Sequence, residues 1–422
     1  MYGQTCPGFI SRILYKRATW SCAHFRGSKI KALKISIFIV IALTVFIYHI
    51  IAYGRFSDGI ACFSTEINDG IPDILDDHEH PPPKGKSIFF HETSCNKAEG
   101  WIIQINARQA CAVESAANLN PNSTVYLLYT SPIRYPNVSM FSSHKYKVLQ
   151  ELIKYKNIKI RRVDLKRYTQ NTPLQSWFHT GQLNRSSYVS SHTSDVLRYL
   201  SLWRYGGTYM DLDVVLMKNL EKLKPNYAGA ESQLSVAAGI INFDHQNAGH
   251  HLAELCLKEI EMNFKGEDWG YNGPGVITRV LNHICDTMKT YAMTEERCKG
   301  NIYCYYQCNN LKFLAEKSCA SVNISIYMNV FVLDHFFLFL FTGFNVLPSS
   351  AFYPIHWRKW KLYFDTQRLD LALKQVNNSY AIHVWNKFSI DTTIYTRQSD
   401  VLYGNIARKY CPNVYKASGD TF

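Results

Sequence analysis

Two aspartates stand two residues apart in the run Arg204-Tyr-Gly-Gly-Thr-Tyr-Met-Asp-Leu-Asp-Val214, and their type and spacing suggest metal chemistry. Residues 208–217 are apolar enough to predict a strand, in which alternate side chains point to the same face. Asp211 and Asp213 should therefore present two carboxylates side by side, suited to a divalent cation that keeps open positions for substrate phosphates. The pattern indicates transfer of a group carried on a diphosphate. A strand-end turn with two solvated acids is the alternative.

The segment just upstream, residues 194–203, has the apolar spacing of an amphipathic helix, with Ser194 or Thr193 as the candidate cap. Gly206 should end this helix, because glycine readily takes the left-handed conformation that many helix ends need. Asp195 and Arg198 lie one turn apart on the same helix face. They form either a pair that contacts a substrate or a surface ion pair of little energetic value.

These residues resemble the DXD sugar-binding region of nucleotide-sugar glycosyltransferases, in the order Ser194-Asp195-x-x-Arg198 and Gly206-Gly207-x-Tyr209-x-Asp211-x-Asp213. Three later segments are similar to parts of the α1,4-glycosyltransferase family: Trp269-Gly-Tyr-Asn-Gly-Pro-Gly-Val-Ile-Thr-Arg-Val280, Phe352-Tyr-Pro-Ile-His-Trp357 and Ala381-Ile-His-Val-Trp-Asn-Lys387. The resemblance implies a retaining enzyme that moves galactose or an N-acetylhexosamine from a UDP-sugar to a glycolipid acceptor, lactosylceramide-like, in α1,4 linkage. An α1,4-N-acetylgalactosaminyl- or N-acetylglucosaminyltransferase that acts on glycolipid or mucin-type glycans is the alternative within the family. Whether a protein nucleophile or same-face attack achieves retention stays open.

The resemblance also implies roles around the diphosphate. Asp211 and Asp213 become metal residues, and His383 becomes a third metal ligand unless it is structural or contacts the acceptor. Manganese is the expected cation, because carboxylate, imidazole and phosphate ligands suit it. The donor-binding residues implied in the same way are Asp195, Arg198, Tyr209 and Asp211.

A second group of residues is expected on the acceptor side or in the sugar pocket. It consists of Trp269, Tyr271, Asn272 and Trp385. Flat aromatic faces stack on sugar rings, and an asparagine amide can pair with sugar hydroxyls. Plain packing of a glycine-rich loop is the alternative for the first three residues.

Strands and helices alternate in the segment that must position these residues. Apolar runs predict strands at residues 87–90, 124–129 and 158–163, and helices at residues 109–118 and 146–155. Such alternation indicates an α/β fold with a parallel sheet covered by helices on both faces, in which ligands bind at the carboxyl ends of strands. The resemblance implies the GT-A type of Rossmann-like fold.

The N-terminal region has the composition of a membrane-anchored protein. Residues 1–34 hold seven basic and no acidic residues, and residues 35–53 are almost wholly apolar, which predicts a transmembrane signal anchor. The positive-inside rule then places residues 1–34 in the cytosol, with a stem at 54–86 and a luminal catalytic domain at 87–422. A cleaved signal peptide is the alternative, but the apolar stretch is long and starts late. With the resemblance, this predicts a single-pass type II protein of the Golgi membrane, with homo- or hetero-oligomers of Golgi transferases as candidate assemblies.

Cysteines and glycosylation sequons agree with a luminal fate. Ten cysteines follow the anchor and are expected in disulfides, although sequence alone does not give their pairing. The sequons lie at Asn122, Asn137, Asn184, Asn323 and Asn377. The net charge of +13 comes largely from the basic N-terminus, so nucleic-acid binding is rejected.

Residues 321–344 do not fit the family pattern. They are as apolar as a membrane span, yet Asp334 and His335 lie near the centre, and a span would separate His383 from Asp211. The segment is interpreted as an atypical insertion. It leaves an inactive luminal scaffold protein as the alternative from another functional class.

Overall fold

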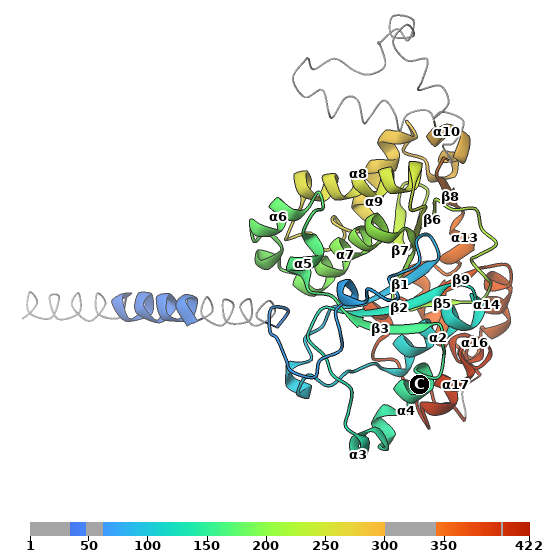
Figure 1. Cartoon of the computed structure of the whole chain (residues 1–422), viewed down its shortest axis with the longest axis horizontal. Helices are drawn as coiled ribbons and strands as arrows, with labels where there is room; N and C mark the ends of the chain where they lie inside the picture. The colour runs from blue at the N-terminus through green and yellow to red at the C-terminus, as the bar shows by residue number, and fades with distance from the viewer. Residues whose placement is uncertain (1–33, 48–61, 300–342, 398–399) are drawn as a thin grey trace, which may run out of the picture. The chain divides into compact units, whose positions relative to one another are not determined.

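The computed structural model describes residues 34–47, 62–299, 343–397 and 400–422 (Figure 1). The chain divides into two units, Met1–Asp58 and Gly59–Phe422. In the first unit, residues 34–47 form a helix with exposed apolar side chains. This helix overlaps the predicted anchor, and residues 48–53 of that prediction lie outside the described residues. Among the helices that the structure describes, none combines the length and the apolarity that crossing a membrane requires.

The second unit is built on a mixed sheet of seven strands in the order β3-β2-β1-β4-β7-β6-β8, while β5 and β9 pair separately. The strands are β1 (Ser87–Glu92), β2 (Thr124–Tyr129), β3 (Ile158–Arg162), β4 (Gly207–Met210), β5 (Val214–Leu216), β6 (Tyr227–Ala230), β7 (Val236–Phe243), β8 (Asn345–Leu347) and β9 (Ala381–His383). β3, β2, β1 and β4 run parallel, and β7 is antiparallel to β4 and β6. The predicted parallel sheet is confirmed for these four strands.

Helices cover both faces of the sheet, as predicted. In Figure 1, α7, α8 and α9 lie on one side and α2, α16 and α17 on the other, each side with its own apolar core. The helices are α2 (Ala107–Leu119), α3 (Val138–Phe141), α4 (Lys147–Leu152), α5 (Leu165–Thr169), α6 (Gln175–His179), α7 (Val189–Tyr205), α8 (Asn247–Asn263), α9 (Pro274–Ile284), α10 (Glu295–Lys299), α13 (Ser349–Phe352), α14 (Leu369–Val376), α15 (Asn386–Ser389), α16 (Leu402–Tyr410) and α17 (Pro412–Ala417). Short 3-10 helices are η1 (Ile74–Asp76), η2 (Lys97–Glu99), η3 (His144–Tyr146), η4 (Leu183–Arg185), η5 (Thr290–Ala292) and η8 (Trp357–Phe364).

The helix before the two aspartates, α7, is longer than predicted. It begins at Val189, so Thr193 and Ser194 both lie inside it and the predicted cap is wrong. Its end at Gly206 is confirmed, with φ of 63°. The next glycine is fixed by space as well as by its φ of 89°, because a Cβ on Gly207 would lie 2.2 Å from the Ser87 carbonyl oxygen. The two glycines let the chain turn from α7 directly into β4 beside β1.

The single strand predicted over residues 208–217 is wrong. β4 ends at Met210, and the chain turns through residues 211–213 before β5 starts in the other sheet. The Val214 amide donates to the Asp211 carbonyl at 3.1 Å, which closes the turn. β4 pairs with β7, whereas β5 pairs with β9, which lies near the C-terminus. Residues 208–217 therefore form two strands in two different sheets. Apolar periodicity could not reveal that change of partner.

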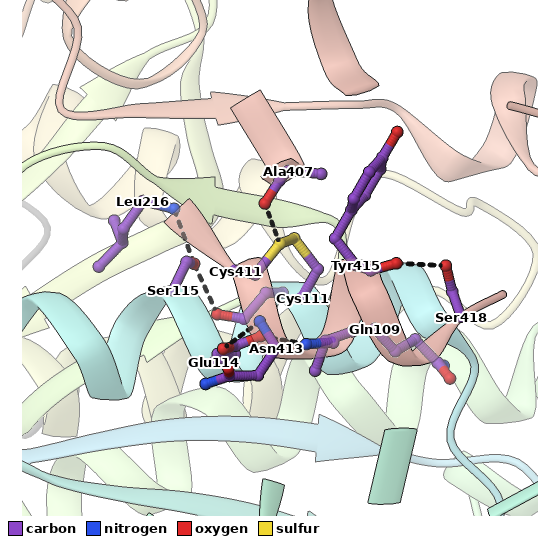
Figure 2. The surroundings of a disulfide bond; sticks show 12 residues. Gln109, Cys111, Glu114, Ser115, Leu216, Ala407, Cys411, Asn413, Tyr415 and Ser418 are labelled. Carbon is purple, nitrogen blue, oxygen red and sulfur yellow. Dashed lines mark hydrogen bonds between the residues drawn. A yellow bond between two sulfur atoms is a disulfide. The ribbon is translucent and has the colours of Figure 1, made fainter. Parts of the chain in front are cut away.

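The C-terminus is tied to α2 by a disulfide between Cys111 and Cys411 (Figure 2). Beside this bond the fully buried Glu114 carboxylate accepts hydrogen bonds from the Asn413 and Val414 amides at 3.1 and 2.8 Å. The Tyr155 hydroxyl donates to the same carboxylate at 2.6 Å. Glu114 thus satisfies amides at the start of α17 that have no partner within the helix.

Two further disulfides join Cys62 to Cys95 and Cys285 to Cys298. The expectation that every cysteine beyond the anchor is paired is wrong for Cys256, which is free and buried. Cys304, Cys308 and Cys319 lie outside the described residues, as do residues 321–342 of the predicted insertion. The chain re-enters the described structure before Phe344, which is fully buried, and β8 then pairs with β6.

Part of the predicted stem packs against the sheet. The Ile71 amide donates to the Ile133 carbonyl at 2.7 Å, and Ile74 is buried in the core. The compact unit begins at Gly59, so its boundary differs from the predicted start at Ser87. The stem was predicted because residues 54–86 lack periodicity, but irregular segments can still bury individual apolar side chains.

Candidate active site

Asp211, Asp213 and His383 come together at the end of β4. One side-chain ligand atom from each lies within 4.8 Å of those of the other two. The His383 Nε2 atom is 3.6 Å from Asp211 Oδ2 and 3.3 Å from Asp213 Oδ1. The two carboxylates predicted to act together do meet, and the distant histidine joins them. They converge through the turn rather than through strand alternation.

Backbone pairing explains how a histidine 170 residues away reaches this turn. β5 and β9 run antiparallel with Val214 opposite His383, which puts the imidazole beside Asp213. The Asn386 amide donates to Asp213 Oδ2 at 2.8 Å, and the Asp211 amide donates to the Gly239 carbonyl at 2.9 Å. Each aspartate is therefore held by a backbone contact from a different part of the chain.

The three groups shift one another's pKa values. Burial raises the pKa of Asp211, but the Arg198 guanidinium and the His383 imidazole outweigh burial and lower it to about 2. Burial raises the pKa of Asp213, and His383 offsets this only in part. Burial lowers the pKa of His383, but the two carboxylates outweigh it, so this pKa is raised. The imidazole and the two carboxylates thus interact strongly with one another, as expected for groups this close together.

This donor set fits a divalent cation. Two carboxylates and one imidazole supply hard oxygen and borderline nitrogen ligands, which suit manganese or magnesium better than a soft metal. Three protein ligands leave coordination positions for a substrate. Asp211, Asp213 and His383 are the residues that would hold the ion.

Arg198 and Asp195 form a buried pair behind the turn. The Arg198 guanidinium lies 2.7 Å from Asp195 and 3.6 Å from Asp211 Oδ1, and it donates to the Ala238 carbonyl at 2.8 Å. Both side chains are only 7% exposed, so the surface ion pair weighed from the sequence is wrong. Burial raises the pKa of Asp195 to about 7, because Arg198 offsets the desolvation only in part.

Tyr209 links this pair to the aspartate cluster. Its hydroxyl donates to Asp211 Oδ1 at 2.6 Å and accepts from the Ser194 hydroxyl at 3.0 Å. The Arg198 guanidinium lies 4.6 Å from the centre of the Tyr209 ring. One carboxylate oxygen of Asp211 is thereby committed to the protein, which leaves the other facing His383.

The glycine-rich loop after α8 closes over Asp195. A Cβ on Gly273 would lie 2.2 Å from Asp195 Oδ1, so only glycine fits. Asn272 is fully buried, and its side-chain amide forms hydrogen bonds with the Lys265 backbone and with the His192 ring. This use of the Asn272 amide favours the alternative of loop packing over contact with a sugar.

The two aromatic residues of the same loop are more accessible. Trp269 is 43% exposed, its indole donates to the Ser191 hydroxyl at 3.2 Å, and the Lys387 ammonium lies 3.6 Å from its ring centre. The Arg279 guanidinium lies 3.8 Å from the centre of the Tyr271 ring. Trp269 therefore remains a candidate for sugar contact, and it joins this loop to α15.

Trp385 lies directly against the cluster, with its ring centre 4.1 Å from that of His383. Its indole donates to the Ile355 carbonyl at 2.8 Å, and its φ of 56° is in the left-handed region. A bulky residue in that region carries backbone strain, which concentrates at functional sites. The geometry keeps Trp385 as a candidate for the sugar pocket.

Sequence reasoning missed two residues that shape the site. A Cβ on Gly239 would lie 2.9 Å from Asp211 Oδ2 and 3.1 Å from the His383 ring, so glycine makes room for the cluster. The Tyr353 hydroxyl accepts from the Ile240 amide at 3.0 Å, and its ring packs beside His383. A lone glycine inside the apolar run of β7 was the available signal, since it often marks a close approach.

Comparisons with known proteins agree with this geometry. Residues 106–230 match a family described as "Glycosyltransferase sugar-binding region containing DXD motif". Residues 245–332 and 339–418 match one described as "Alpha 1,4-glycosyltransferase conserved region", with the gap inside the predicted insertion. The chain is thus a glycosyltransferase with a DXD sugar-binding region. More particularly, it belongs to the α1,4-glycosyltransferase family.

Characterised relatives cover most of the chain. A "Lactosylceramide 4-alpha-galactosyltransferase" of Rattus norvegicus is 28% identical over 338 residues, 78% of this chain and 75% of the relative. An "Alpha-1,4-N-acetylglucosaminyltransferase" of Homo sapiens is 27% identical over 334 residues, 78% of this chain and 80% of the relative. Among solved structures, "PaToxG Glycosyltransferase" aligns at 18% identity over 55% of this chain and 79% of its own, with a TM-score of 0.33, too low to establish a shared fold.

Proposed function

We propose that this chain is a retaining α1,4-hexosyltransferase that moves galactose from UDP-galactose to a glycolipid acceptor of the lactosylceramide type. The observation that carries the proposal is the cluster of Asp211, Asp213 and His383 within a chain of this family. The similarity to galactosyltransferases named for lactosylceramide supports the sugar and the acceptor. Its luminal placement behind an N-terminal anchor in the Golgi membrane is part of the same proposal.

The reaction breaks the bond between the anomeric carbon and the β-phosphate oxygen, and joins that carbon to the 4-hydroxyl oxygen of the acceptor. The acceptor hydroxyl loses its proton, and UDP leaves with the bonding electron pair. A divalent cation, proposed to be Mn²⁺, supplies stabilisation of the charge that grows on the leaving diphosphate. Retention of the α configuration is compatible with two routes: a double displacement through a carboxylate or amide of the protein, or attack from the face that the diphosphate leaves.

The buried pair supports the donor side of the site. Arg198 holds Asp211 in place through its guanidinium and through the Tyr209 ring below it. We assign donor binding to Asp195, Arg198, Tyr209 and Asp211, with Asp195 and Arg198 supporting Asp211 from its buried side. A rigid, desolvated arrangement of this kind needs little reorganisation as charge develops, which favours the transition state.

An N-acetylhexosamine donor is the second candidate, because the human relative named above transfers N-acetylglucosamine. The candidate donors differ in the pattern of their sugar hydroxyls and in whether the sugar carries an acetamide group. Contacts in the sugar pocket therefore decide which donor is used. The inactive scaffold is a weaker candidate, since the cluster and the buried pair are both complete.

The test is a donor and acceptor screen with the purified full chain. UDP-galactose, UDP-GalNAc and UDP-GlcNAc are offered with lactosylceramide, with lactose and without acceptor, and UDP release and sugar transfer are followed. The proposal expects galactose transfer in α1,4 linkage, at least about tenfold faster than transfer of either N-acetylhexosamine. Preference for an N-acetylated donor would show that the chain is an N-acetylhexosaminyltransferase. If the folded protein turns over no donor, the inactive scaffold becomes the favoured function.

A further inference from the structure

A basic and aromatic surface lies beside the candidate active site, on η8 and α15. We call it the aromatic-basic face. It consists of Trp357, Arg358, Lys359, Trp360, Lys361, Lys387, Phe388 and Ile390. Phe388 and Ile390 are 43% and 60% exposed, so this face presents two large apolar side chains to solvent. The Trp357 and Phe388 rings stack across the two elements at 5.6 Å and 12°.

The charge of this face is of one sign. Residues 357–364 and 386–390 contain four cations and no acid, and the nearest acids along the chain, Asp365 and Asp391, lie just beyond its ends. The Arg358 guanidinium lies 5.0 Å from the Trp357 ring centre, and the Lys361 ammonium lies 5.9 Å from that of Trp360. Aromatic bodies flanked by long cationic side chains are typical of surfaces that sit at lipid headgroups.

The face continues directly into the candidate site. The Phe388 amide donates to the Trp385 carbonyl at 2.8 Å, and the Trp385 ring packs on His383. On the η8 side, the Trp385 indole donates to the Ile355 carbonyl, two residues before Trp357. A ligand held on this face would therefore present its protruding part beside the aspartate cluster.

We propose that the aromatic-basic face rests on the lipid surface that carries the acceptor, with Phe388 and Ile390 inserted at headgroup depth. The proposal rests on the proposed function, because it takes the acceptor to be a membrane lipid whose sugar stands above that surface. The cations of the face lie at the level of lipid phosphates, and the sugar headgroup reaches the site past Trp385. A protein partner would use the same aromatic residues, and it is the other outcome of the test.

The test uses the full chain reconstituted into phosphatidylcholine vesicles that hold no other protein. Galactose transfer is measured to lactosylceramide in the same vesicles and to lactose in solution. The variant Phe388→Ser/Ile390→Ser removes the apolar part of the face. Met288→Ser/Tyr291→Ser is the matched control, because it removes two side chains that are 65% and 67% exposed elsewhere.

The proposal expects the face variant to lose about tenfold in rate with lactosylceramide while its rate with lactose stays within about twofold, since only the lipid acceptor needs the lost apolar contact. The control should keep both rates. Equal loss with both acceptors, or no loss with either, overturns the proposal, and the second result would assign the face to a protein partner. Wild-type chain that uses neither acceptor and hydrolyses no UDP-sugar would instead contradict the proposed function itself.

Discussion

Gly239 offers no functional atom, yet the geometry of the aspartate cluster depends on its missing side chain. We predict that Gly239→Ala lowers metal-dependent UDP-sugar hydrolysis by about 100-fold, because the new methyl group displaces Asp211 and His383, and small misplacements at a reacting centre are costly. The free energy of unfolding should fall by only about 1–3 kcal/mol. Gly270→Ala is the control, since no atom lies within 4 Å of its added Cβ. Equal hydrolysis by the two variants would show that the cluster tolerates the displacement.

The Asp195–Arg198 pair gives a second prediction at the residue scale. Arg198→Met should lower the free energy of unfolding by about 3–5 kcal/mol, because it leaves a buried carboxylate without its partner. Asp365 and Arg368 have the same spacing and a 2.7 Å contact, but Arg368 is 56% exposed, so Arg368→Met should change the free energy of unfolding far less than Arg198→Met does. Denaturant unfolding of both variants makes the comparison. Similar losses at the two positions would mean that burial does not decide the energy of the pair.

At the scale of elements, local sequence predicted the regular parts well. The strands at Ser87, Thr124 and Ile158 begin where predicted. β1 and β2 are buried on both faces and have a continuous apolar sequence, whereas β3, at the edge of the sheet, shows buried and half-buried residues in alternation. The turn at residues 211–213 could not be predicted, since β5 leaves the main sheet to pair with β9 about 165 residues later. His383 was nevertheless selected, through the family resemblance and not through spacing.

The disulfides should stabilise the fold by amounts that depend on the length of the loop each one closes. The chain-entropy model gives about 3 kcal/mol for closing the Cys285–Cys298 loop and about 5–6 kcal/mol for the Cys111–Cys411 loop, whose sequence separations are 13 and 300. Cys111→Ala/Cys411→Ala should therefore lower the thermal midpoint more than Cys285→Ala/Cys298→Ala, and it should also loosen α17 from α2. Differential scanning calorimetry of the two double variants measures the difference. A larger loss from the short loop would contradict the expectation.

At the scale of the whole molecule, the compact unit includes residues that look like a stem in the sequence. A chain that starts at Ser87 should melt at a lower temperature than one that starts at Gly59, because it loses the Cys62–Cys95 bond and the burial of Ile71 and Ile74.

Thermal unfolding compares the two truncated chains. Cys62→Ala/Cys95→Ala in the longer chain separates the disulfide from the apolar packing. Equal melting temperatures for the chains starting at Ser87 and Gly59 would show that residues 59–86 add no stability.

The most direct measurement is Mn²⁺ binding by the full chain, followed through the electron paramagnetic resonance signal of the free ion, together with UDP-sugar hydrolysis in the same samples. Asp213→Asn is compared with Asp365→Asn, because Asp365 belongs to the exposed ion pair with Arg368 and is not one of the proposed metal ligands. We predict that the wild type and Asp365→Asn bind Mn²⁺ and hydrolyse the donor alike. Asp213→Asn should bind Mn²⁺ at least about tenfold more weakly and lose about 100-fold or more in hydrolysis. Undiminished binding and turnover in Asp213→Asn would contradict the assignment of Asp211, Asp213 and His383 as the metal centre of this glycosyltransferase.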